Sequence, residues 1–130
     1  MSQKPETQFS NKLHRLLGRS VYVEKMSNAY RYGLPDFYYE GESGILWCEH
    51  KFISKPWVTP VAAEDICKTK SWIHQHRWLT RAHKNNQNTC VIVGTPKVAA
   101  VLRYPYNFDP QSQGFKPLSH AVNYIESFVL

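Results

Sequence analysis

The chain has 130 residues, and its 16 Lys and Arg against 10 Asp and Glu give a net charge of +6. This length supports one domain with its own core, and the basic balance favours a polyanionic partner. No apolar stretch reaches the ~20 residues that cross a membrane, and no signal-peptide pattern opens the sequence. We therefore expect a cytoplasmic protein without a membrane partner.

Three cysteines are present, at Cys48, Cys67 and Cys90. Their spacing is not typical of a zinc site, and no secretory context favours disulfides. We expect free thiols at small core positions.

The first predicted element is a helix over residues 6–17. Pro5 stands near its start and Gly18 follows its end, as helix boundaries favour. Glu6 extends the apolar stripe of this helix by one step, which makes it a candidate to reach a site beside the core. An acid in a first helical turn also complements the helix dipole, so both roles stay open. Residues 21–24 then alternate between apolar and polar, which predicts a strand.

A hairpin of two strands follows. Gly41 and Gly44 flank its tight turn. Asp36 and Glu49 each lie five residues from the nearer glycine, and this symmetry holds for a two-residue or a four-residue loop. The two acids are therefore expected directly opposite each other, with side chains roughly 5 Å apart on one face.

Such a pair is destabilising unless something offsets the repulsion. A bound divalent cation does so, because hard cations take carboxylate oxygens and keep several waters or substrate phosphates as further ligands. Because side chains alternate along a strand, Lys51 shares the face of Glu49 and His50 points away.

A helix is predicted from residue 69 or 71 to Lys84. It carries Trp72, Gln75, Leu79 and Ala82 on one face, and Gln75 is the polar member of that stripe. Thr89–Gly94 and Val98–Arg103 have the composition of strands, with a turn between them. Residues 54–69 allow no assignment.

The C-terminal part is predicted as a loop or arm over residues 104–117 and a helix over 118–129. Ser119 is a candidate cap of this helix. The helix itself is a candidate for core cover or for a subunit interface.

Pro35-Asp36 and Glu49-His50-Lys51 resemble the signature of the PD-(D/E)XK nuclease superfamily. The hairpin between the two motifs and the helices on either side make the chain similar to small VRR-NUC-like phage and bacterial nucleases and to Holliday-junction resolvases. The similarity extends over about residues 5–103.

The resemblance implies an α/β fold with the core order αβββαβ, in which helices flank a central mixed sheet. Residues 1–130 would form a single nuclease domain, to which 118–129 add a C-terminal helix.

The resemblance also implies roles for individual residues. Asp36, Glu49 and the backbone carbonyl of His50 would bind Mg²⁺, for which Mn²⁺ is a possible substitute. Glu6 would join the metal shell directly or through water. Lys51 would orient the attacking water and offset negative charge in the transition state. Gln75 matches by position a glutamine that points at the site in related nucleases; a partly buried, hydrogen-bonded Gln is the other interpretation.

The expected function is metal-dependent hydrolysis of DNA phosphodiester bonds, directed by DNA structure such as a junction or flap, in phage-related DNA processing. The alternatives are a sequence-specific endonuclease of the homing or restriction type, and a non-catalytic DNA-binding module with a degenerate nuclease core. A homodimer or higher homo-oligomer is expected, because two cuts on opposed strands are most simply made by two related sites. Candidate DNA contacts are Arg31, Tyr32, Lys55, Lys68, Lys70 and Arg77.

Overall fold

The computed structural model describes residues 4–26, 33–53, 70–106 and 114–130. Six strands in these ranges form one mixed sheet in the order β1-β2-β3-β4-β5-β6, with β3 and β4 parallel and the other neighbours antiparallel. In chain order the elements are α1 (Pro5–Leu16), β1 (Tyr22–Lys25), β2 (Phe37–Gly41), β3 (Gly44–Phe52), α3 (Lys70–Lys84), β4 (Thr89–Gly94), β5 (Val98–Leu102), β6 (Lys116–Pro117) and α5 (Leu118–Val129).

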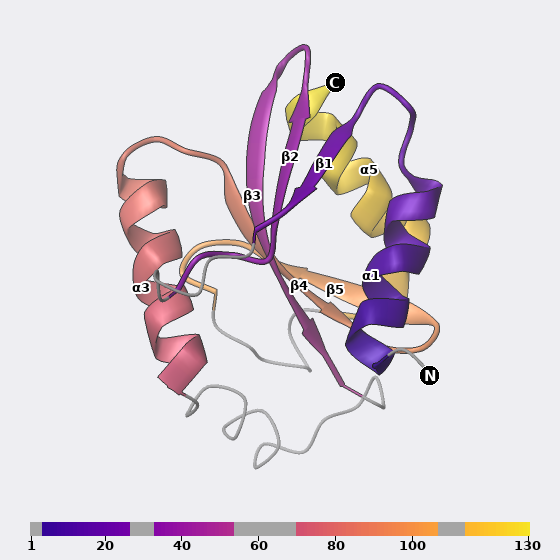
Figure 1. Cartoon of the computed structure of the whole chain (residues 1–130), viewed down its shortest axis with the longest axis horizontal. Helices are drawn as coiled ribbons and strands as arrows, with labels where there is room; N and C mark the ends of the chain where they lie inside the picture. Colours follow the sequence, from indigo (N-terminus) through magenta and orange to yellow (C-terminus); the bar gives the residue numbers. More distant parts are fainter. Residues whose placement is uncertain (1–3, 27–32, 54–69, 107–113) are drawn as a thin grey trace.

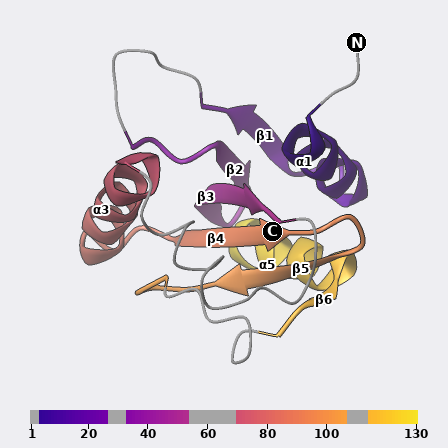
Figure 2. The same cartoon turned by 90° about the horizontal axis from the view of Figure 1, so that it is seen from below.

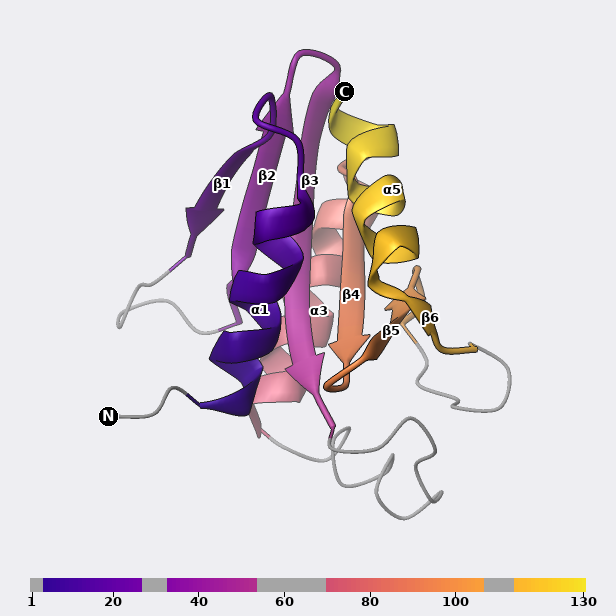
Figure 3. The same ribbon diagram turned by 90° about the vertical axis from the view of Figure 1, so that its right-hand side faces the viewer.

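The helices cover the sheet from both sides. α1 and α5 lie on one face and α3 lies on the other (Figures 1 and 3). Figure 2 shows the same separation, with α3 and α1 on opposite sides of β3. Strand β3 therefore runs between two helical layers, and its alternate side chains reach both of them.

Strand β4 is buried on both faces, as expected of a parallel central strand. Cys90 and Ile92 belong to the larger core cluster with α1 and α5. Val91 and Val93 belong to the smaller cluster with Trp72 and Leu79 of α3 and with Leu102 and Tyr106. The predicted free thiols are confirmed for Cys48 and Cys90, which are buried, whereas Cys67 lies outside the described residues.

The hairpin has the predicted register. Gly41 pairs with Gly44, and Phe37 pairs with Cys48. The hairpin tip also touches the end of α5, where Ser43 N–H donates to the carbonyl of Val129 at 2.8 Å. A Cβ on Gly41 would collide with that same carbonyl oxygen. Glycine is therefore needed at this position for close packing.

The predicted α/β class, the mixed sheet and the C-terminal helix are confirmed. The prediction that Ser119 caps the last helix is wrong, because Pro117 is the N-cap residue and no side chain caps the helix. The physical reason is that Lys116 and Pro117, predicted as part of a loop, pair with β5 and lead directly into α5. Ser119 consequently lies inside the first helical turn.

Candidate active site

Asp36 and Glu49 face each other where β2 begins beside β3. The pairing of Phe37 with Cys48 places the preceding residue, Asp36, opposite Glu49. The backbone N–H of Asp36 donates to Glu49 Oε1 at 3.1 Å, and the backbone N–H of His50 donates to Asp36 Oδ2 at 3.0 Å. Each carboxylate thus accepts a hydrogen bond from a backbone N–H of the opposite segment. The structure therefore brings the two predicted acids together.

Lys51 lies on the same face as Glu49. Its Nζ is 3.1 Å from Glu49 Oε2 and donates to Gln75 Oε1 of α3 at 2.7 Å. The ammonium group also lies 5.5 Å from the centre of the Trp72 ring, within the range of a cation–π contact. The lysine is therefore held between the acid pair and helix α3.

The segment before Asp36 reaches the site by packing against α3. Gly33 has a φ of +85°, and a Cβ at this position would lie 2.5 Å from the carbonyl oxygen of His74. Only glycine combines this backbone conformation with so close an approach. Gly33 thus allows the segment before Asp36 to lie against α3, the helix that carries Gln75.

Burial dominates the electrostatics of the acid pair. Glu49 is only 1% exposed, and burial and then the charge of Asp36 raise its pKa to about 8, against a smaller opposing effect of Lys51. Burial also raises the pKa of Asp36, opposed mainly by the His50 N–H and by Lys51. In this arrangement the site favours a proton on the carboxylates, or a cation that takes the place of the proton.

Glu6 shares a groove with Asp36. It is exposed at the start of α1 and borders, together with Asp36, Lys4 and Lys25, a groove of about 450 Å³ between α1 and β1. Its pKa is raised, first by burial and then by the charge of Asp36. Within the described ranges, no three acids, histidines or cysteines come close enough to form a metal-binding group. Glu6 is therefore near the acid pair but not a third member of it.

The donors at the acid pair fit a hard divalent cation. Asp36 and Glu49 supply carboxylate oxygens. In a β-strand the N–H and C=O of one residue point toward the same edge of the strand. Because the N–H of His50 donates to Asp36, the carbonyl of His50 points toward the Asp36 side as well. Three oxygen donors at one strand edge suit Mg²⁺, which keeps several waters and needs few protein ligands.

Sequence reasoning missed a buried polar group directly behind the site. The ring of His50 is fully buried and contacts Ser10 and Tyr39, and Tyr39 in turn contacts His14. Ser10 and His14 follow Glu6 by one and two helical turns. This spacing of polar residues on the core-facing side of a helix was the available signal.

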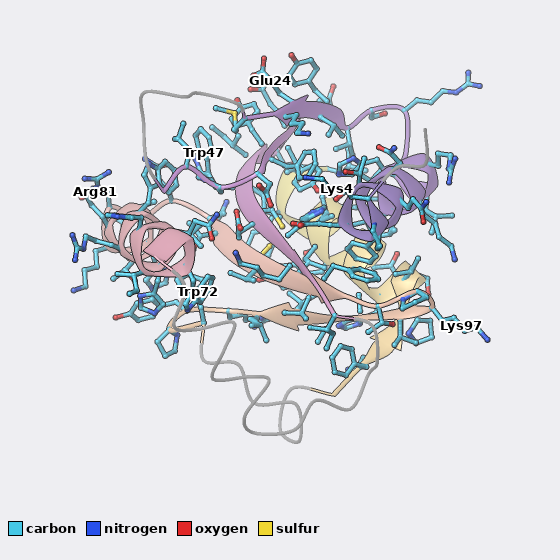
Figure 4. The ribbon with its side chains drawn as sticks, turned by 60° about the horizontal axis from the view of Figure 1, so that its bottom comes forward. Lys4, Glu24, Trp47, Trp72, Arg81 and Lys97 are labelled. Carbon is cyan, nitrogen blue, oxygen red and sulfur yellow. The ribbon has the colours of Figure 1, made fainter. Side chains whose placement is uncertain are left out.

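The candidate DNA contacts are only partly covered by the structure. Arg77 is exposed on α3. Arg31, Tyr32, Lys55 and Lys68 lie outside the described residues, as does the side chain of Lys70. Figure 4 shows the neighbouring Arg81 pointing away from the sheet on the outer side of α3.

No family model matches this sequence, and no curated protein does. Among solved structures, Hjc of Archaeoglobus fulgidus, a Holliday junction resolvase from an archaeal hyperthermophile, superposes with a TM-score of 0.53 at 14% identity. The match covers 92% of this chain and 97% of Hjc. The chain has the fold of a Holliday junction resolvase. The expected likeness to the PD-(D/E)XK nucleases is thereby confirmed at the level of the fold.

None of the helices in the described ranges combines the length and apolar character needed to cross a bilayer.

Proposed function

We propose that this chain is a divalent-metal-dependent DNA endonuclease that recognises DNA structure, with branched DNA as its substrate. The observation that carries the proposal is the pair of half-buried Asp36 and buried Glu49 with Lys51 against it. A fold that only needed stability would gain by replacing two facing carboxylates that repel each other, one of them buried and the other half-buried. The resolvase-like fold supports DNA as the substrate.

Asp36, Glu49 and the carbonyl of His50 would hold Mg²⁺ or Mn²⁺, with Glu6 reaching the metal shell through water. When bound, such a metal polarises a phosphoryl oxygen and acidifies water. Lys51 places a positive charge beside the acid pair, where it would stabilise negative charge on the phosphate being attacked. Gln75 would hold the lysine in this orientation through its 2.7 Å hydrogen bond.

Helix α3 would bind the DNA backbone with its outer face. The helix contains no acidic residue, whereas it carries Lys70, Arg77, Arg81 and Lys84. Arg77, Arg81 and Lys84 are exposed. Because neighbours three and four apart share a helix face, these cations form a stripe. Phosphate neutralisation by such a stripe supplies sequence-independent affinity.

A chain of this size leaves little surface for reading base edges, which favours cleavage directed by DNA shape. Two opposed cuts in a branched substrate would be made most simply by a homodimer.

The test is Mg²⁺-dependent cleavage over labelled single-stranded, duplex, flap and four-way-junction DNA, with the Lys51→Ala variant as the control. We expect cutting of branched substrates by the wild type. For Lys51→Ala we expect turnover to fall by about 10²-fold or more, with DNA binding retained. Cutting at one discrete duplex site would indicate a sequence-specific enzyme. Binding without cutting under any divalent metal would indicate a non-catalytic module.

A further inference from the structure

A chain of four buried or half-buried polar side chains runs behind the acid pair. Ser10 Oγ is 2.8 Å from His50 Nδ1, His50 Nε2 is 2.9 Å from the Tyr39 hydroxyl, and that hydroxyl is 2.7 Å from His14 Nε2. His50 and Tyr39 are both 0% exposed, and Ser10 is 4% exposed. Unsatisfied polar groups at such depth are costly, so each contact must serve as a true hydrogen bond.

The number of protons available in this row of hydrogen bonds restricts the tautomers of its two imidazole rings. Tyr39 has a single hydroxyl proton and faces the Nε2 atom of two imidazole rings. It can donate to one ring only and must accept from the other. Burial lowers the pKa of both rings, that of His14 to about 4, so both are neutral near pH 7. One ring therefore carries its proton on Nε2 and the other on Nδ1.

The four hydrogen-bonded side chains join the helix and strands that carry the site residues. Ser10 and His14 come from α1, which carries Glu6 one helical turn before Ser10. Tyr39 comes from β2, which begins directly after Asp36, and His50 comes from β3, between Glu49 and Lys51. Apolar packing, such as that of Phe9 against this sheet face, has no preferred direction. Hydrogen bonds have narrow distance limits and so fix how far α1 is shifted along the sheet.

We infer that Ser10, Tyr39 and His14 are positioning residues that set the register of α1 on the sheet and thereby place Glu6 relative to Asp36 and Glu49. The inference rests on the proposed function, because it assigns these residues to the metal-dependent reaction. Their effect acts through Glu6, since it is the site residue that α1 supplies.

A double-mutant cycle tests this coupling. Tyr39→Phe keeps the buried ring and removes both hydrogen bonds of the hydroxyl. We expect this change to lower kcat on a four-way junction by about 5-fold or more, with KM unchanged. In the Glu6→Gln background, we expect the same change to lower kcat by a further factor of less than about two. Mn²⁺ affinity, measured by calorimetry without DNA, is expected to follow the same non-additive pattern.

Tyr106→Phe is the matched control. Tyr106 is 1% exposed, and its hydroxyl also has two partners, Thr89 Oγ1 and the Leu79 carbonyl, in the other core cluster. We expect a similar loss of stability against urea and an effect on kcat that simply adds to that of Glu6→Gln. In the wild type, ¹⁵N spectra of the imidazole rings should show opposite tautomers for His14 and His50.

Additive effects of Tyr39→Phe and Glu6→Gln in a wild type that cleaves DNA would overturn the inference and leave the proposed function intact. So would equal losses of kcat for Tyr39→Phe and Tyr106→Phe at equal stability. A wild type that neither cleaves DNA nor binds Mn²⁺ would overturn the proposed function, and this inference with it.

Discussion

Lys51 and Gln75 are joined by a 2.7 Å hydrogen bond that links the Glu49 face of β3 to helix α3. The amide oxygen of Gln75 accepts from Nζ, while Glu49 lies on another side of the same ammonium group at 3.1 Å. The ring centre of Trp72, one turn earlier on α3, lies 5.5 Å from the same ammonium group. The orientation of Lys51 is therefore set by the packing of α3 as well as by its own strand.

Loss of this amide should slow turnover without weakening DNA binding. We expect Gln75→Ala to lower kcat by about 10-fold, because Lys51 then loses one of the contacts that hold it in place. Single-turnover cleavage and equilibrium DNA binding, measured in parallel, check this result. Gln87→Ala, an exposed change beyond the end of α3, is the control. An unchanged rate for Gln75→Ala would show that the hydrogen bond has no role in orienting the lysine.

The metal-free protein should lose stability as pH rises, because of Glu49. Its pKa is raised from 4.5 to about 8 in the folded chain, so the folded state binds the proton more tightly than the unfolded state does. The contribution of this group to stability is fully present below pH 4.5 and is lost as pH rises through about 8.

Urea unfolding in EDTA measures this dependence directly. We expect Glu49→Gln to have little effect relative to wild type at pH 5 and to be the more stable protein at pH 8.5. Mg²⁺ should restore stability at the higher pH to the wild type only, because a metal that binds the folded site stabilises it by mass action. Parallel pH profiles for the two proteins would contradict the raised pKa of Glu49.

The outer face of α3 should contribute to DNA affinity through charge alone. We expect Arg77→Gln with Arg81→Gln to weaken binding to all DNAs alike and to reduce the slope of log affinity against log salt by about 2. Turnover at saturating DNA should stay near the wild-type value, because neither side chain touches the acid pair. Lys12→Gln with Arg15→Gln removes the same charge from exposed positions on α1. Equal losses for both double variants would indicate a net-charge effect instead of a binding face.

The parts of the site that follow from local rules could be predicted from the sequence. The opposition of Asp36 and Glu49 needs only the alternation of a strand and the position of Gly41 and Gly44. The inward direction of Gln75 follows from the helical spacing of its apolar neighbours. Its contact with Lys51, by contrast, depends on how α3 packs across the sheet, and only the family resemblance indicated it.

Other features depend on tertiary contacts that no local pattern encodes. The link from Ser10 to His50 joins residues 40 positions apart and requires α1 to dock at one position on the sheet. Strand β6 has two residues and exists because Lys116 and Pro117 meet the edge of β5, which propensity alone does not predict. The short distance between Gly33 and α3 likewise follows from packing.

The most direct measurement is cleavage of a labelled four-way junction by wild type and Asp36→Asn over a titration of Mg²⁺. Asparagine keeps the shape of the side chain and an oxygen that can accept the His50 N–H, but it removes the charge that a cation requires. We predict Mg²⁺-dependent cutting by the wild type and none by Asp36→Asn at any metal concentration, with both proteins folded and both binding the junction. Equal cleavage by the two proteins, or cleavage by the wild type in EDTA, would contradict a metal-dependent reaction at the Asp36–Glu49 pair.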